Sequence, residues 1–145
     1  MSTRIPNNQL RFARIVLWFY SLLFLLFAAP AVVVPVPLAA TVDTVLPTAT
    51  SRIDFAATYG GSVFGIAAFL AFCALHQERV RWGLLANAFF LAGYATTRSV
   101  GIVLAQGHVK PVLYIILAIE SSGAVISFLV ARKAMKLENP SPSLQ

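Results

Sequence analysis

Two residues of opposite charge, Arg98 and Glu120, lie within long apolar stretches of this chain. A charge in hydrocarbon is costly, so charged residues inside membrane segments are rare and are usually paired or functional. A guanidinium beside a carboxylate forms a salt bridge, and a carboxyl group in a low-dielectric pocket suits general-acid chemistry. Any activity of this chain is therefore expected to centre on these two residues.

Other polar residues fall near the pair if the apolar stretches are helices. Asn87, Tyr94 and Arg98 recur at intervals of seven and four residues, which places them on one helical stripe. The expected ligand-binding set is Arg98, Glu120, Tyr59, Tyr94, Asn87 and Thr97, and the catalytic set, if the protein is an enzyme, is Glu120, Tyr59 and Asp54. The simpler interpretations are an interhelical hydrogen bond for Asn87, packing for the two tyrosines and a purely structural salt bridge for the charged pair.

The composition is that of an integral membrane protein. Of 145 residues, 59% are hydrophobic and 11% are charged, with a mean hydropathy of +0.80, whereas a soluble domain has roughly 25% charged residues. The net charge of +6 comes largely from basic residues beside the apolar runs, where they set topology and meet anionic lipid, so nucleic-acid binding is not expected. The single cysteine, Cys73, lies in an apolar run, and no phosphate-binding loop, paired-histidine motif or nucleophile elbow occurs, so neither a cofactor nor a metal is expected.

Four apolar runs predict the fold: Ile15–Ala29, Phe55–Leu75, Trp82–Ala105 and Val112–Ala131. Three of them have about the 20 residues that a helix needs to cross a bilayer, and strictly alternating barrel strands are absent. The expected fold class is all-α, a four-transmembrane-helix antiparallel bundle in a single domain, 1–137. Its helices are expected at about 13–34, 55–76, 81–105 and 111–134, with an outer loop at 35–54 and a disordered tail at 138–145.

The first run is the short one, and it leaves an alternative open. A signal peptide with Arg11 and Arg14 as its basic region would end at a poor cleavage site, Ala28–Ala31. The preferred interpretation is a transmembrane helix that continues through Ala31–Val34 or ends in the proline-rich stretch that follows.

Lys and Arg residues near the span ends predict the orientation of the chain. Eight lie on one side, namely Arg4, Arg11, Arg14, Arg79, Arg81, Arg132, Lys133 and Lys136, and two lie on the other, namely Arg52 and Lys110. Both termini are therefore expected in the cytoplasm, and the protein is expected in a bacterial inner membrane.

The two charges are expected at the same depth. Arg98 lies seven residues before the end of the third run, roughly 10 Å below the outer boundary at 1.5 Å per residue. Glu120 lies eight residues into the fourth run, about 12 Å deep by the same rise. Because the two helices are antiparallel neighbours, a salt bridge between them is geometrically natural.

Small residues at intervals of four predict close helix contacts. Gly61 and Gly65 are spaced in this way, as are Gly93, Thr97 and Gly101. Such spacing lets membrane helices approach closely, since no hydrophobic force drives their association.

The motifs also resemble those of a known family. The stretch from Asp54 to Gly65 contains Tyr-Gly-Gly, Arg98 to Gly101 form Arg-x-x-Gly, and Glu120 stands in the last run. In these features the chain resembles an uncharacterised family of small four-helix bacterial membrane proteins, known only as a domain of unknown function. The resemblance implies a four-helix bundle and no particular activity, and a looser likeness to DoxX-like proteins is one of fold alone.

Three functions are compatible with these patterns. The preferred one is a binding or accessory protein that holds a lipid, quinone or isoprenoid in an outward-facing polar pocket, or that docks onto a membrane protein partner or a second copy of itself. The second is an isomerase or cyclase of a lipid-phase substrate with Glu120 as general acid, which a neighbouring arginine opposes because it favours the ionised carboxylate. The third is a small transporter subunit, although four helices without an inverted repeat are few for alternating access.

Overall fold

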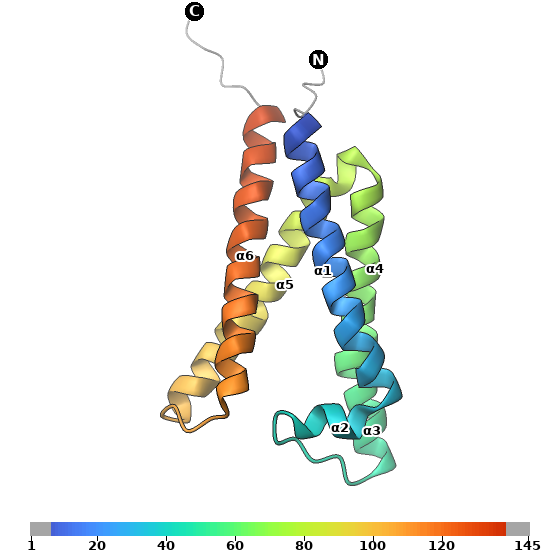
Figure 1. Cartoon of the computed structure of the whole chain (residues 1–145), viewed down its shortest axis with the longest axis vertical. Helices are drawn as coiled ribbons and strands as arrows, with labels where there is room; N and C mark the ends of the chain where they lie inside the picture. Colours follow the sequence, from blue (N-terminus) through green and yellow to red (C-terminus); the bar gives the residue numbers. More distant parts are fainter. Residues whose placement is uncertain (1–6, 139–145) are drawn as a thin grey trace, which may run out of the picture.

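The computed structural model describes residues 7–138, which are helical apart from short connections (Figure 1). The elements are α1 (Asn7–Val33), α2 (Pro35–Ala40), α3 (Ala49–Phe55), the π-helix η1 (Ala56–Gly61), α4 (Ser62–Leu75), α5 (Gln77–Leu104) and α6 (Pro111–Glu138). No strand occurs within the described residues, so the fold class is all-α as expected. The segments α3, η1 and α4 follow one another without a break and form one long helical column.

Within the described part of the chain, three helical segments are long and apolar enough to cross a membrane: Asn8–Val33, Ala49–Leu75 and Pro111–Lys133. Large apolar side chains point outward along them, for example Leu26 at 65% and Ile115 at 61% exposure. Exposed apolar surface on this scale is suited to contact with acyl chains and not with water. The chain therefore has the surface of a small membrane protein.

The helix α5 is not among these three segments, although it is one of the longest. Glu78, Arg79 and Arg81 lie in its first turns, and Asn87 and Arg98 lie further along it. These polar residues lower its average hydropathy, so whether α5 also crosses the membrane depends on how they are paired.

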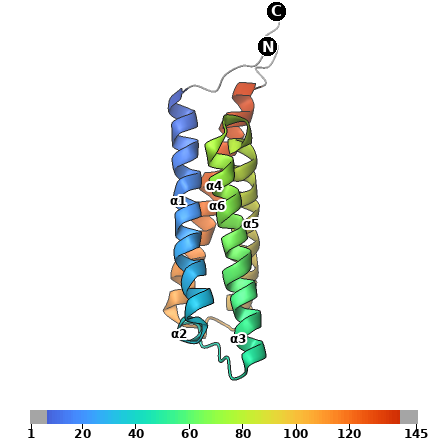
Figure 2. The ribbon, with the colours of Figure 1, turned by 90° about the vertical axis from the view of Figure 1, so that its right-hand side faces the viewer.

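The long helices gather into two pairs. α5 lies against α6, and α1 lies against α4, while α5 also contacts α4 and α1 (Figure 1). The start of α1, the α4–α5 turn and the end of α6 lie at one end of the molecule, and we call this the basic end. The opposite end holds α2, α3 and the α5–α6 turn, and we call it the loop end (Figure 1). The two pairs diverge toward the loop end, and the view turned by 90° shows the long helices running roughly alongside one another (Figure 2).

The core lies where the two pairs meet. Leu17 of α1, Leu70 of α4 and Leu84 of α5 are completely buried and belong to one apolar cluster. In a membrane this burial stabilises the fold through close packing, since lipid tails are as apolar as leucine. One polar contact accompanies it, because the Ser21 hydroxyl of α1 donates a 2.9 Å hydrogen bond to the Ala67 carbonyl oxygen of α4.

The segment 35–54, expected as an outer loop, contains α2 and most of α3 instead. Pro35 disfavours a helical conformation at Val34, which ends α1. The same proline then suits the first position of α2, where no backbone N–H is needed. Thr48 starts α3 through a capping box with Ser51. A small apolar cluster of Ala31, Ala39, Leu46 and Phe55 attaches this segment to the loop end.

The other long helices extend past the bounds expected from hydropathy. α1 begins at Asn7 and not at 13, α5 begins at Gln77 and not at 81, and α6 ends at Glu138 and not at 134. Apolarity marks only the part of a helix that suits hydrocarbon, so polar first and last turns escape it. Of the expected tail, Glu138 is the last residue of α6, and 139–145 lie outside the described residues.

The glycines predicted to mediate helix contacts do not do so within the described residues. A Cβ atom added at Gly61, Gly65, Gly93 or Gly101 would meet nothing within 4 Å. Three other glycines make the close contacts. An added Cβ would clash with Cγ2 of Val32 at Gly60, would lie 2.6 Å from Cβ of Cys73 at Gly83, and would lie 2.5 Å from the Tyr20 hydroxyl oxygen at Gly123. The spacing of small residues therefore did not predict which glycines lie at helix–helix contacts, because this depends on how the helices cross.

Candidate functional site

Arg98 of α5 and Glu120 of α6 form a bidentate salt bridge, as predicted from their matching depths. Nη2 of Arg98 donates to Oε1 of Glu120 at 2.7 Å, and Nε donates to Oε2 at 2.9 Å. This parallel two-bond geometry is the strongest arrangement that a guanidinium and a carboxylate can make. Both carboxylate oxygens are therefore occupied by one edge of the guanidinium.

The two partners are buried to different extents. The Glu120 side chain is only 9% exposed, whereas the Arg98 side chain is 23% exposed. The second terminal nitrogen of Arg98, Nη1, makes no hydrogen bond within the described residues. Glu120 thus anchors the guanidinium, and Arg98 keeps unused N–H donors on its more accessible side.

Two tyrosine hydroxyls accompany the pair. Tyr94 lies one helical turn before Arg98 on α5, and Tyr59 lies in the π-helix η1. Both phenols lie within electrostatic range of Arg98, and neither hydroxyl makes a hydrogen bond within the part of the chain that the structure describes. The structure therefore places Tyr59 and Tyr94 in the neighbourhood of the charged pair, and their hydroxyls have no hydrogen-bond partner among residues 7–138.

The π-helix is a feature that the sequence did not reveal. Single π-turns inside α-helices are rare and occur often at functional sites. Here η1 spans the Tyr-Gly-Gly motif, so the wider turn carries Tyr59. Tyr59 is 40% exposed and its ring stacks on Phe55 with centroids 4.6 Å apart. Adjacent glycines were the only available signal, and they do not distinguish a π-turn from ordinary packing.

Three other expected site residues make no hydrogen bond or ion pair with Arg98 or Glu120 within the described residues. Asp54 is exposed, and its carboxylate makes no ion pair or hydrogen bond among the described residues. Thr97 is also exposed and makes no such contact within residues 7–138. Asn87 is fully buried about three turns away from Arg98, where its Nδ2 donates to the Ser127 hydroxyl oxygen at 2.8 Å. The simpler interpretation of Asn87, an interhelical hydrogen bond, fits this contact.

An exposed ion pair that the sequence did not predict crosses the loop end. Lys110, just before α6, lies with Nζ 2.6 Å from Oδ1 of Asp43 in the turn after α2. Both side chains are well exposed, so this contact adds little stability. The ion pair nevertheless connects the loop before α6 with the loop after α2, and so links the two helix pairs at the loop end.

Arg98, held by Glu120, and the hydroxyls of Tyr59 and Tyr94 could together bind a polar group, and we call these four residues the clamp. It offers unused guanidinium N–H donors and two phenolic hydroxyls, all on helices that diverge toward the loop end (Figure 1). Among the described residues no group of three or more His, Cys, Asp or Glu side chains gathers in a way that could hold a metal ion. These donors suit a ligand with oxygen acceptors.

Comparison with known proteins places the chain in a family. The family model described as a domain of unknown function, DUF4345, matches residues 12–131. The chain belongs to this uncharacterised family, as the resemblance of its motifs implied. No significant match was found among curated proteins or among solved structures, and no match links the chain to DoxX-like proteins.

Proposed function

We propose that this DUF4345 protein is a four-crossing membrane protein that binds the polar head of a hydrophobic ligand between Arg98, Tyr59 and Tyr94. The observation that carries the proposal is a guanidinium that Glu120 fixes along one edge while its other N–H donors have no partner among the described residues. A donor that is already held in place is suited to binding, because little side-chain conformational entropy is then lost when a ligand associates.

The proposal includes α5 as the fourth crossing, with both termini in the cytoplasm. α5 has 28 residues, enough to span the bilayer at 1.5 Å per residue, and its one mid-helix charge is neutralised by Glu120. The start of α1 and the end of α6 lie at the same end of the molecule, which suits an even number of crossings (Figure 1). The excess of Lys and Arg at that end favours the cytoplasmic side, here the inner face of a bacterial membrane.

Cysteine accessibility tests this topology. Cys73 is buried, so the unmodified chain serves as the blank. A membrane-impermeant maleimide added to intact cells is expected to label His108→Cys in the exposed α5–α6 turn and not Gln77→Cys at the basic end, because α5 crosses the membrane between them and only the former faces outward. Labelling of Gln77→Cys alone would reverse the orientation, and equal labelling of both in intact cells would contradict the crossing of α5.

The net charge of the clamp favours a neutral polar head. Arg98 and Glu120 together carry no net charge, so an anionic ligand would leave an uncompensated charge at low dielectric. A quinone or another isoprenoid with carbonyl or hydroxyl oxygens presents acceptors without that cost. Its apolar tail would lie along the apolar outer surfaces of the helices.

The geometry favours binding over the two alternative functions. A general acid needs a proton on a carboxyl oxygen, whereas both oxygens of Glu120 accept hydrogen bonds from Arg98. The same pairing removes Glu120 as a ready proton carrier for transport. Asp54, a member of the expected catalytic set, makes no hydrogen bond or ion pair with Arg98 or Glu120 within the described residues.

Native mass spectrometry of the protein purified in mild detergent tests the proposed binding. We expect a bound hydrophobic molecule on the wild type and its loss from the double variant Arg98→Met/Glu120→Leu, in which the donors are gone without a stranded charge. Lys110→Gln is the matched control, since it removes an exposed cation at the loop end and should keep the ligand. Retention of the same molecule by the double variant, or its loss from Lys110→Gln as well, would refute the clamp.

A further inference from the structure

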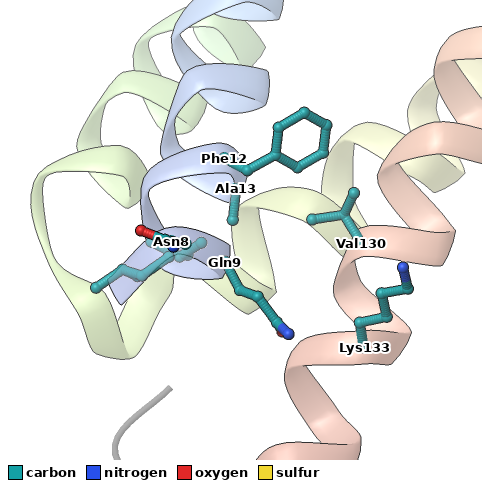
Figure 3. Close-up of a pocket in the computed structure, with 8 residues that line it drawn as sticks. Asn8, Gln9, Phe12, Ala13, Val130 and Lys133 are labelled. Carbon is teal, nitrogen blue, oxygen red and sulfur yellow. The ribbon is translucent and has the colours of Figure 1, made fainter. Parts of the chain in front are cut away.

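A second site lies at the basic end, well away from the charged pair. A cavity of about 240 Å³ opens there, and its walls come mainly from α1 and α6. The residues lining it are Asn8, Gln9, Leu10, Phe12, Ala13, Val80, Val130 and Lys133. Phe12, Ala13 and Val130 form apolar walls, while the side chains of Gln9 and Lys133 reach toward the space between α1 and α6 (Figure 3). The cavity therefore combines an apolar wall with a polar and cationic rim.

The cation on this rim has no partner among the side chains that the structure describes. The Lys133 ammonium makes no hydrogen bond or ion pair within the described residues, and neither does the Gln9 amide. One turn further along α1 from the rim, Nε of Arg14 is buried and has no hydrogen-bond partner among residues 7–138. Cationic donors that the protein leaves unmatched suit an anionic ligand.

The surroundings of the cavity carry a strong excess of positive charge. The basic residues at this end are Arg11, Arg14, Arg79, Arg81, Arg132 and Lys133, and among residues 8–133 the only acidic one there is Glu78. Exposed basic residues beside transmembrane helices attract anionic lipid. A site with this charge and an apolar wall is complementary to an amphiphile with a negative head.

We infer that this cavity is a binding site for one anionic phospholipid. The lipid phosphate accepts hydrogen bonds from Lys133 and Gln9 at the rim, and the first part of an acyl chain packs against Phe12 and Val130. This site differs from the proposed clamp in both position and charge, because the clamp is neutral and lies among other residues. The inference therefore does not depend on the ligand proposed for Arg98.

Lipid titration followed by native mass spectrometry tests the inference on the full chain. We expect phosphatidylglycerol to bind more tightly than phosphatidylcholine with the same acyl chains, and Lys133→Gln to weaken phosphatidylglycerol binding about fivefold, the effect of one basic residue near an anionic surface. Lys133→Arg keeps the charge and should keep the preference. Arg132→Gln is the matched control, because Arg132 is an exposed neighbour that does not line the cavity.

Each remaining outcome of the titration would overturn the inference. Equal binding of the two lipids would remove the charge argument. Equal weakening by Lys133→Gln and Arg132→Gln would mean attraction by the basic end as a whole, without a site. Displacement of the lipid by inorganic phosphate alone would mean that a free anion and not a phospholipid is the ligand. Lys133 is exposed, so its substitutions should fold, and circular dichroism of each variant checks this.

Discussion

Replacing Arg98 by methionine will lower the free energy of unfolding by about 3–5 kcal/mol, the cost of leaving a buried charge without its partner. The stranded group is Glu120, which is 7% exposed and receives both of its described hydrogen bonds from Arg98. Glu120→Leu should cost less, because the Arg98 side chain is 23% exposed and its long stem allows the charge to move toward polar surroundings. The measurement is unfolding by SDS titration in detergent micelles.

The double variant Arg98→Met/Glu120→Leu completes this test. Replacing both partners of a buried ion pair by apolar residues of similar size is often nearly neutral. We therefore expect the double variant to recover most of the stability lost by Arg98→Met. Additive losses in the two single variants and the double variant would mean that the two side chains do not interact in the folded protein.

Gly83→Ala is expected to lower the free energy of unfolding by about 1–3 kcal/mol, the usual cost of overpacking a core. The new methyl carbon would lie 2.6 Å from Cβ of Cys73 and 3.1 Å from both terminal carbons of Leu17. Cβ of Cys73 is attached directly to the backbone of α4, so relief of the clash requires α4 and α5 to move apart. The same SDS titration measures the loss.

Gly93→Ala is the matched control for Gly83→Ala on the same helix. Nothing lies within 4 Å of the added Cβ at this position. Alanine is favoured over glycine in a helix by about 1 kcal/mol, so this variant should be neutral or more stable. A loss of stability at Gly93 equal to that at Gly83 would place an unrecognised helix contact at Gly93.

The sequence predicted the central ion pair because only simple geometry was needed. Short connections make α5 and α6 antiparallel neighbours, and the distances of Arg98 and Glu120 from that turn fix their relative depth. The cost of an unpaired charge in hydrocarbon then requires the two to meet. Tyr94 followed from helical periodicity, since it lies one turn from Arg98 on the same stripe.

Other features depended on contacts that spacing does not determine. Small residues occur on several faces of the helices, and the way the helices cross decides which face meets a neighbour. An added Cβ would therefore have free space at Gly61 and Gly93 but would clash with a neighbouring helix at Gly83 and Gly123. Asp54 was expected in the site, and the structure shows it exposed, with no hydrogen bond or ion pair among the described residues. The short helices α2 and α3 lie in a mildly apolar segment whose proline content suggested a loop, although a proline is well tolerated in the first turn of a helix.

Photo-cross-linking from position 59 tests most directly whether the diverging ends of the helices hold a ligand. Tyr59 is 40% exposed and makes no hydrogen bond within the described residues, so p-benzoylphenylalanine should be tolerated there. Tyr114, an exposed tyrosine on α6 near the loop end, provides the control position. We expect irradiation at position 59 to attach a molecule with the mass of the co-purified ligand, and irradiation at position 114 not to attach it. Capture of only bulk membrane phospholipid at position 59, or of the same molecule equally at both positions, would contradict a ligand held by Arg98.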